Sequence, residues 1–153
     1  VTLGVSRVGH GFVKRAYDNH NAVLAGEHSG HYYFDETHGC DDGIAASLLT
    51  YAVLSDLDTP VSEALEEYRK YVKSGEQNFE VDDRDAAIQR ILDRYEDQEI
   101  ERIDGVTVHV DHNTWFNVRK SNSEPLVRLN AEGTNQETVD SIVSEAEKII
   151  RDD

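Results

Sequence analysis

The chain has 153 residues, which is enough for one medium-sized or two small globular units. Its 31 acidic residues outnumber 15 basic ones, so the formal net charge is −16, and such a surface repels nucleic acids and anionic membranes. Neither is therefore expected as a partner.

The first half of the chain alternates strand and helix signals, as expected for part of an α/β domain with a mixed sheet. In chain order we predict a strand at 2–7, a helix at 10–19, and strands at 22–25 and 31–35. The chain contains no methionine, even at position 1, and opens with an apolar run typical of a strand. We therefore expect it to be part of a longer protein.

Two further helices are predicted before a domain boundary. Asp41 or Asp42 can cap the first of them. Its apolar side chains should point inward: Ile44, Leu48, Leu49 and Val53. Thr59 as cap and Pro60 at the first helical position should start the other, which runs through about residue 72. The polar segment 73–76 ends the helical pattern, so the predicted domains are residues 1–74 and 75–153.

The second half predicts a small α+β domain. The predicted order is a strand at 77–81, a helix at 84–96, strands at 100–103, 106–111, 114–119 and 126–131, and a helix at 135–151. The last helix has a capping box of Thr134 and Glu137. Apolar stripes run along both helices: Ile88, Ile91, Leu92 and Tyr95 on the first, and Val139, Ile142, Val143, Ala146, Ile149 and Ile150 on the second. Strands bracketed by two helices indicate an antiparallel sheet with both helices on one face. The fold class is thus α/β followed by α+β.

A polar turn between the last two predicted strands could bind an anion. Its residues are Arg119, Ser121, Asn122 and Ser123, with Arg128 returning on the next strand. Guanidinium groups pair phosphate oxygens bidentately, and hydroxyl groups and turn amides supply further donors. The alternative is a polar hairpin whose arginines are solvated or ion-paired. Trp115 and Phe116 precede the turn, and we expect them to pack in the core rather than stack on a sugar.

A second polar loop lies in the first half, where Gly-Glu-His-Ser-Gly-His occupies residues 26–31 before an aromatic strand. The carboxylate of Glu27 and the hydroxyl of Ser29 suit the hydroxyl groups of a sugar, whereas the alternative is a solvent-facing loop. His31 ends this motif, and His10 lies in Arg-Val-Gly-His-Gly-Phe at residues 7–12. Histidine titrates near neutral pH, so either could relay a proton or hold a ligand, and a purely structural role stays open.

The two loops together resemble motifs of the α-D-phosphohexomutases, which include phosphomannomutases and phosphoglucomutases. The turn Arg-Lys-Ser-Asn-Ser-Glu-Pro at 119–125 is similar to the family's phosphate loop, Arg-x-Ser-Asn-Thr-Glu-Pro, with Ser123 in place of threonine. Residues 26–31 are similar to its sugar loop, Gly-Glu-x-Ser-(Gly/Ala)-His, and the two occur in the family's order. The resemblance covers nearly the whole chain, as the later part of the third domain and the complete fourth domain.

The resemblance implies a phosphoryl exchange between hexose 6-phosphate and hexose 1-phosphate, through an enzyme phosphoserine and a hexose 1,6-bisphosphate. Glu27 and Ser29 would hold the sugar. The non-reacting phosphate would be held by Arg119, Ser121, Asn122 and Ser123, while Arg128 would bind it or brace the loop. The family's Thr-Ala-Ser-His-Asn-Pro serine loop and Asp-Gly-Asp-x-Asp-Arg metal loop have no counterpart here. Mg²⁺ would therefore be bound elsewhere in a parent enzyme, and this chain alone should be inactive.

Several alternatives stay open. One is a non-catalytic module that binds a phosphosugar, and another is a phosphoglucosamine mutase, although Asn122 favours the mannose/glucose branch of the family. A zinc site at His28, His31, His38 and Cys40 is disfavoured, because their spacing matches no zinc pattern. Cys40 is the only cysteine, so an intrachain disulfide is excluded and a cytoplasmic setting is expected. The acid excess over only five lysines suggests adaptation to high salt.

Overall fold

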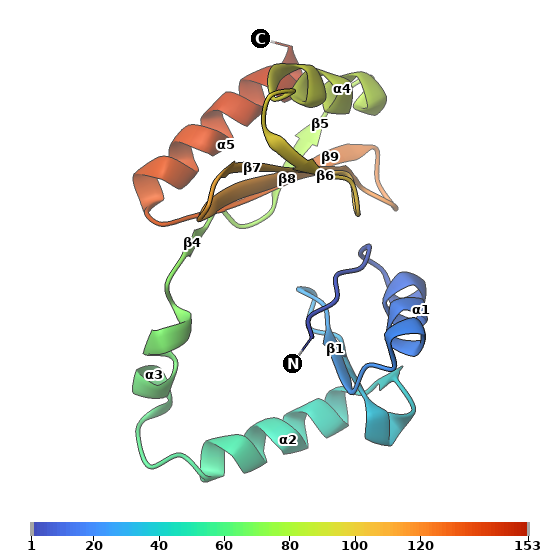
Figure 1. Ribbon diagram of the computed structural model, residues 1–153, viewed down its shortest axis with the longest axis vertical. Coiled ribbons are helices and arrows are strands. Elements are labelled where there is room, and N and C mark those ends of the chain that lie inside the picture. Colours follow the sequence, from blue (N-terminus) through green and yellow to red (C-terminus); the bar gives the residue numbers. More distant parts are fainter. Residues whose placement is uncertain (1, 153) are drawn as a thin grey trace. The chain divides into compact units, whose positions relative to one another are not determined.

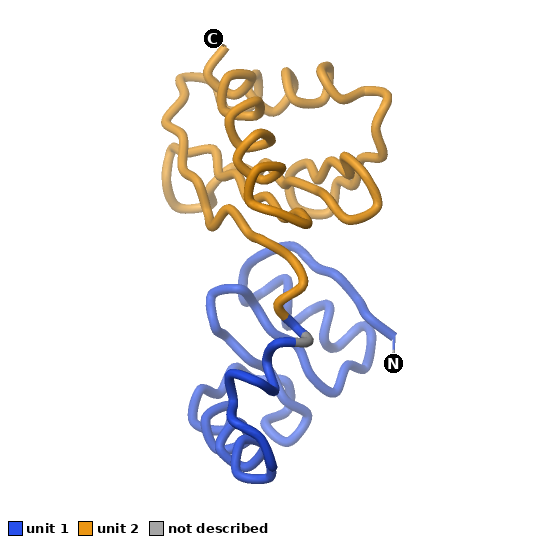
Figure 2. Tube along the Cα trace, turned by 90° about the vertical axis from the view of Figure 1, so that its left-hand side faces the viewer, with its two compact units in different colours: residues 1–68 blue, residues 69–153 orange. Residues whose placement is uncertain are grey.

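The computed structural model describes residues 2–152, except for the side chain at position 67 (Figure 1). The chain forms two compact units, Val1–Tyr68 and Arg69–Asp153 (Figure 2). The division falls a few residues before the predicted boundary. The reason is that β4 (Val72–Lys73) pairs with β9 (Leu126–Gly133) and so joins the sheet of the second unit.

The first unit contains helix α1 and a small antiparallel sheet of order β1-β2-β3. Its elements are α1 (His10–His20), β1 (Leu24–Gly26), β2 (Tyr32–Phe34), η1 (Asp35–Thr37), β3 (Cys40–Asp41), α2 (Gly43–Ser55), α3 (Val61–Ala64) and η2 (Glu66–Tyr68). The predicted helix at 10–19 and the strand at 31–35 are confirmed. The core is small: Val13, Tyr17 and Tyr33 are buried, with Ala22 and Ala25 packed against them.

Three predictions for the first unit are wrong. Residues 2–7 form no strand, and none of the strand pairs among the described residues includes them. Asp42 caps α2 as expected, with its carboxylate accepting from two amides of the first turn. The side chains predicted to point inward, however, are 49–76% exposed: Ile44, Leu48, Leu49 and Val53. An apolar stripe predicts that a helix face can be buried, but not that a partner for it is present.

The third wrong prediction is the helix from Thr59 to about residue 72. Pro60 occupies the N-cap position, and α3 ends at Ala64. The chain then passes through η2 and becomes extended at β4. Because β4 forms a ladder with β9, its hydrogen bonds in the sheet override the helical pattern of this segment.

The second unit is a six-stranded antiparallel sheet with two helices on one face (Figure 1). The order is β4-β9-β8-β7-β6, and β5 also pairs with β9. Its further elements are β5 (Gln77–Glu80), α4 (Arg84–Arg94), β6 (Glu99–Glu101), β7 (Val106–Asp111), β8 (Thr114–Lys120) and α5 (Gln136–Arg151). All strands and helices predicted for this half are present, and the predicted class of α+β is confirmed.

One core fills the space between this sheet and its helices. Strands β7, β8 and β9 bury every second side chain, as a half-buried sheet requires. The fully buried residues include Ile91, Phe116, Leu129 and Ile150, which come from α4, β8, β9 and α5. Phe116 therefore packs in the core as predicted, whereas Trp115, for which the same was predicted, is half-buried and lies outside this core.

The helix caps of this unit follow local hydrogen bonding. Asp83 caps α4 by accepting from the amides of Asp85 and Ala86. The predicted capping box of Thr134 and Glu137 is wrong by one residue at its start, because Asn135 is the N-cap of α5 and accepts from the Thr138 amide at 2.9 Å. Asparagine caps at least as well as threonine, and here its extended backbone places it at the cap. None of the described helices is long and apolar enough to cross a membrane.

Candidate functional site

The hairpin between β1 and β2 brings together the residues of the predicted sugar loop. The Glu27 amide donates to the His31 carbonyl at 2.9 Å, and the Gly30 amide donates to the Glu27 carbonyl at 2.9 Å. Gly30 has a φ of +87°, a conformation that glycine adopts without strain. This tight turn places Glu27, Ser29 and His31 at one end of the hairpin.

The carboxylate of Glu27 is held by two donors. The Tyr33 hydroxyl donates to Oε1 at 2.5 Å, and the Gly9 amide donates to Oε2 at 3.2 Å. The Tyr33 hydroxyl also lies 3.2 Å from Nδ1 of His10. Because the hydroxyl proton is given to Glu27, the Tyr33 oxygen accepts from His10, which must therefore carry a proton on Nδ1. Tyr33 thus links two predicted site residues that lie far apart in the sequence.

The surroundings of Tyr33 keep its hydroxyl group protonated, so that it can donate to Glu27. The side chain is fully buried, and burial raises the pKa of its phenol, with further contributions from the hydrogen bond to Glu27 and its charge. A raised pKa keeps the hydroxyl protonated at all physiological pH values, so it remains a donor. From the sequence, this tyrosine is predicted only to lie in a strand. Its position as the inward-facing residue at the centre of β2 is the feature that would have identified it as a site residue.

The other two predicted residues form a separate pair. Ser29 Oγ lies 2.8 Å from Nδ1 of His31, and both side chains are exposed. The other ring nitrogen of His31, Nε2, lies 3.9 Å from Oδ2 of Asp41 on β3. The two histidines therefore have different environments: His10 is coupled to Glu27 through a buried phenol, whereas His31 is coupled to a serine hydroxyl.

Replacing Tyr33 with phenylalanine should destabilise the first unit by about 1 kcal/mol, because Glu27 loses a donor at a partly buried position. Urea unfolding followed on the amide NMR signals of residues 24–34 measures this loss. Tyr32→Phe is the matched control, since Tyr32 is 45% exposed. Equal stability of the two variants would show that the Tyr33 hydroxyl contributes nothing to holding Glu27.

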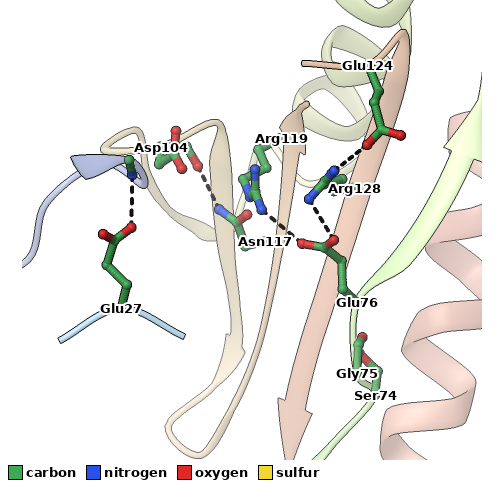
Figure 3. Close-up of polar contacts among 10 residues, drawn as sticks. Glu27, Ser74, Gly75, Glu76, Asp104, Asn117, Arg119, Glu124 and Arg128 are labelled. Carbon is green, nitrogen blue, oxygen red and sulfur yellow. Dashed lines mark hydrogen bonds and ion pairs between the residues drawn. The ribbon is translucent and has the colours of Figure 1, made fainter. Parts of the chain in front are cut away.

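The second candidate site lies on the second unit, where Arg119 of β8 and Arg128 of β9 are direct neighbours in the ladder. Figure 3 shows Glu76 reaching one arginine with each carboxylate oxygen. Oε2 accepts from Arg119 Nη2 at 2.9 Å, and Oε1 accepts from Arg128 Nη1 at 2.8 Å. Arg128 Nη2 donates to Glu124 at 2.6 Å. The side chains of Arg119 and Arg128 are only 12% and 22% exposed, so their ion pairs are less screened than those on an open surface.

The turn beyond Arg119 is braced through its backbone. The Ser121 amide donates to the Leu126 carbonyl at 2.9 Å, and Ser121 is 5% exposed. Arg84, from the start of α4, donates to the carbonyls of Ser121 and Glu124 at 3.4 and 3.2 Å. Two predicted phosphate ligands, Asn122 and Ser123, are exposed on this turn. The structure therefore offers exposed amide and hydroxyl groups on a fixed loop next to Arg119.

Two further contacts shape the same region. Lys120 donates to Asp85 at 2.7 Å, and this hydrogen bond, followed by the lysine's charge, lowers the pKa of the Asp85 carboxyl. Gly105, which has a φ of +70°, lies close against the backbone of Val118 and Arg119. A Cβ at this position would lie 2.3 Å from the Val118 carbonyl oxygen and 2.6 Å from Arg119 Cβ. Only glycine fits here without displacing β8.

Glu76, Arg84 and Gly105 are site residues that the sequence analysis missed. They lie far from the turn in sequence, and the motif at 119–125 carries no signal for them. Within residues 2–152, no group of three or more His, Cys, Asp or Glu side chains is arranged to hold a metal ion.

Comparison with known proteins gives a consistent result over both units. The model of phosphoglucomutase/phosphomannomutase α/β/α domain III matches residues 1–71, and that of the phosphoglucomutase/phosphomannomutase C-terminal domain matches residues 76–149. A phosphomannomutase of Methanocaldococcus jannaschii is 36% identical over 145 residues, which are 95% of this chain and 32% of that protein. The phosphohexose mutases of Xanthomonas campestris pv. campestris are 41% identical over 128 residues, 81% of this chain and 28% of theirs.

A crystal structure shows the same fold. A phosphoglucomutase/phosphomannomutase family protein from Burkholderia thailandensis superimposes with a TM-score of 0.77 at 26% identity. The match covers 95% of this chain and 32% of that one. The chain thus spans about a third of the length of the relatives it matches.

Proposed function

Because the chain belongs to the phosphoglucomutase/phosphomannomutase family, whose domain III and C-terminal domain it matches in order, we propose that it forms the substrate-binding part of a hexose phosphate mutase. The proposed reaction interconverts hexose 6-phosphate and hexose 1-phosphate through a phosphoserine and a hexose 1,6-bisphosphate. The remaining domains of the parent enzyme would supply the serine. They would also bind Mg²⁺, which when bound neutralises charge that develops during phosphoryl transfer.

The turn at residues 119–125 would bind the phosphate that does not react. The relevant charges largely cancel before the ligand arrives, because Arg119 and Arg128 are paired with Glu76 and Glu124. Affinity would then come from directed donors rather than from a positive field. Such donors are the remaining N–H groups of Arg119 and the exposed groups of Asn122 and Ser123, with Ser121 fixing the turn.

The hairpin at residues 26–31 would bind the sugar. The Glu27 carboxylate receives two hydrogen bonds from the protein and keeps further lone pairs for sugar hydroxyl groups. Ser29 can donate or accept, so the pair can serve either orientation of a hexose. His10, with its proton on Nδ1 directed to Tyr33, presents Nε2 as the free ring nitrogen, which could accept a proton from a reacting hydroxyl group.

The observation that carries the proposal is the pairing of Arg119 and Arg128 beside a braced serine–asparagine turn. It is tested by titrating the chain with mannose 6-phosphate and glucose 6-phosphate while following amide NMR signals. Arg119→Ala should weaken binding about tenfold or more, because it removes charge-assisted hydrogen bonds. Arg102→Ala, on an exposed loop of the same unit, makes the same charge change and should leave the affinity unaltered.

A second arm of the same experiment concerns turnover. With mannose 1-phosphate, hexose 1,6-bisphosphate and Mg²⁺, the chain alone should show no isomerisation above background. Equal affinities of Arg119→Ala and Arg102→Ala, or turnover by the chain itself, would contradict the proposed division of roles.

A further inference from the structure

We propose that Glu76 is a positioning residue of the phosphate site, whose carboxylate fixes the Arg119 guanidinium in the orientation that a phosphate group requires. The inference rests on the proposed function of the turn at 119–125, to which it adds a residue outside both sequence motifs. Glu76 lies 43 residues before Arg119 and acts on phosphate only through the two arginines.

Glu76 offsets the repulsion between Arg119 and Arg128, which is the first observation in favour of its positioning role. Arg119 and Arg128 occupy directly opposite positions on β8 and β9, where like charges destabilise a sheet. The Glu76 carboxylate gives one oxygen to each, at 2.9 and 2.8 Å. It uses only Nη2 of Arg119, so the other N–H groups of that guanidinium stay available to a ligand.

The second ground is the rigidity of the backbone that carries Glu76. Segment 74–76 joins β4 to β5, which both pair with β9. Ser74 is bound to Ala131 twice: its amide donates to the Ala131 carbonyl, and its hydroxyl accepts from the Ala131 amide, both at 2.9 Å. Gln77 donates to the Ser74 carbonyl at 3.0 Å. A carboxylate carried on a backbone held this firmly is suited to orienting a partner rather than to moving aside.

The third observation is that Arg119 and Arg128 are engaged differently. Both Nη atoms of Arg128 are engaged, one by Glu76 and the other by Glu124 of the turn. Its Nε is buried and has no hydrogen-bond partner. Arg128 therefore braces the turn through Glu124, and Arg119 is the arginine that reaches the ligand.

The direction in which Glu76→Gln changes phosphate affinity distinguishes two roles of Glu76: positioning Arg119, or competing with phosphate for the arginines. If Glu76 merely competed with phosphate for the arginines, replacing it with the neutral Glu76→Gln would raise phosphate affinity, because a repelling charge is removed. If it positions Arg119, the same substitution lowers affinity, since glutamine offers a single oxygen and cannot hold both guanidinium groups. A fall in affinity thus cannot be a through-space effect of charge.

The experiment uses the whole chain and titrates mannose 6-phosphate, with inorganic phosphate as a second ligand, at constant ionic strength. Glu76→Gln should weaken binding of both about threefold to tenfold and shift or broaden the Nε–H NMR signal of Arg119. Glu76→Asp, which keeps the charge on a shorter side chain, should recover part of the affinity. Glu99→Gln, at an exposed position on β6, makes the same charge change and should bind as the wild type does.

Each outcome decides the inference. Unchanged or higher affinity in Glu76→Gln, with phosphate binding intact in the wild type, overturns the role of Glu76 and leaves the proposed function standing. Absence of phosphate binding by the wild type overturns both. The dispersion of the amide spectrum shows whether each variant is folded. If Glu76→Gln is unfolded, Glu76→Asp decides the question through its phosphate affinity and its Arg119 Nε–H signal. Wild-type values of both in Glu76→Asp overturn the inference.

Discussion

Phe116→Ala should destabilise the second unit by about 3–5 kcal/mol, the usual cost of emptying a core position that an aromatic ring fills. Phe116 is fully buried on β8, and its ring meets edge-to-face that of Tyr95, the C-cap residue of α4, with centroids 5.1 Å apart and planes at 67°. The substitution therefore removes a contact between the sheet and a helix as well as apolar surface. Urea unfolding followed by the fluorescence of Trp115, the single tryptophan, measures the loss.

Phe12→Ala is the control for this prediction, because it makes the same substitution at a 37% exposed site of the first unit. It should leave the tryptophan transition in place. A loss of less than about 1 kcal/mol in Phe116→Ala would mean that the core closes over the vacated space, contrary to the dense packing expected around a central strand.

Gly105→Ala should destabilise the second unit by at least about 2 kcal/mol and should also weaken phosphate binding. The added Cβ would meet the Val118 carbonyl oxygen at 2.3 Å and Arg119 Cα at 2.7 Å, which are backbone atoms that cannot rotate away. The left-handed φ of +70° adds strain for any residue other than glycine. Because the collision is with Arg119 itself, stability and ligand affinity should fall together.

Gly75→Ala isolates the two contributions. Gly75 has a similar φ of +67°, but a Cβ there would have no neighbour within 4 Å. This variant should show only the conformational cost of about 1–2 kcal/mol. If Gly105→Ala proved no less stable than Gly75→Ala in chemical denaturation, the close approach to β8 would be without energetic consequence.

Local patterns in the sequence were sufficient for the second unit and insufficient for parts of the first. The stripes of α4 and α5 and the alternation along β7–β9 agree with the observed burial, because each of these elements packs within one core. The segment 2–7 and the apolar face of α2 have equally clear patterns, yet Leu3 and Val5 of the first and the apolar side chains of the second remain exposed. Burial depends on a partner surface, and a pattern within one segment does not contain that information.

The candidate sites show the same limit at the level of single residues. Motifs predicted the side chains that we propose to face a ligand, such as Glu27 and Arg119, since their chemistry is local. They did not identify Tyr33 or Glu76, whose importance comes from contacts across strands. Strand register decides such contacts, and the sequence of one strand does not fix its register against another.

The polar segment 73–76 was predicted from the sequence to hold a domain boundary, but in the structure positions 74, 75 and 76 each have a separate requirement. The first must supply a hydroxyl to the Ala131 amide, the second must tolerate a left-handed backbone, and the third must carry a carboxylate for two arginines. The consequence concerns how such chains can diverge. In a related protein that had lost Arg119 and Arg128, Glu76 would have no partners. We therefore expect positions 76, 119 and 128 to change together among related proteins.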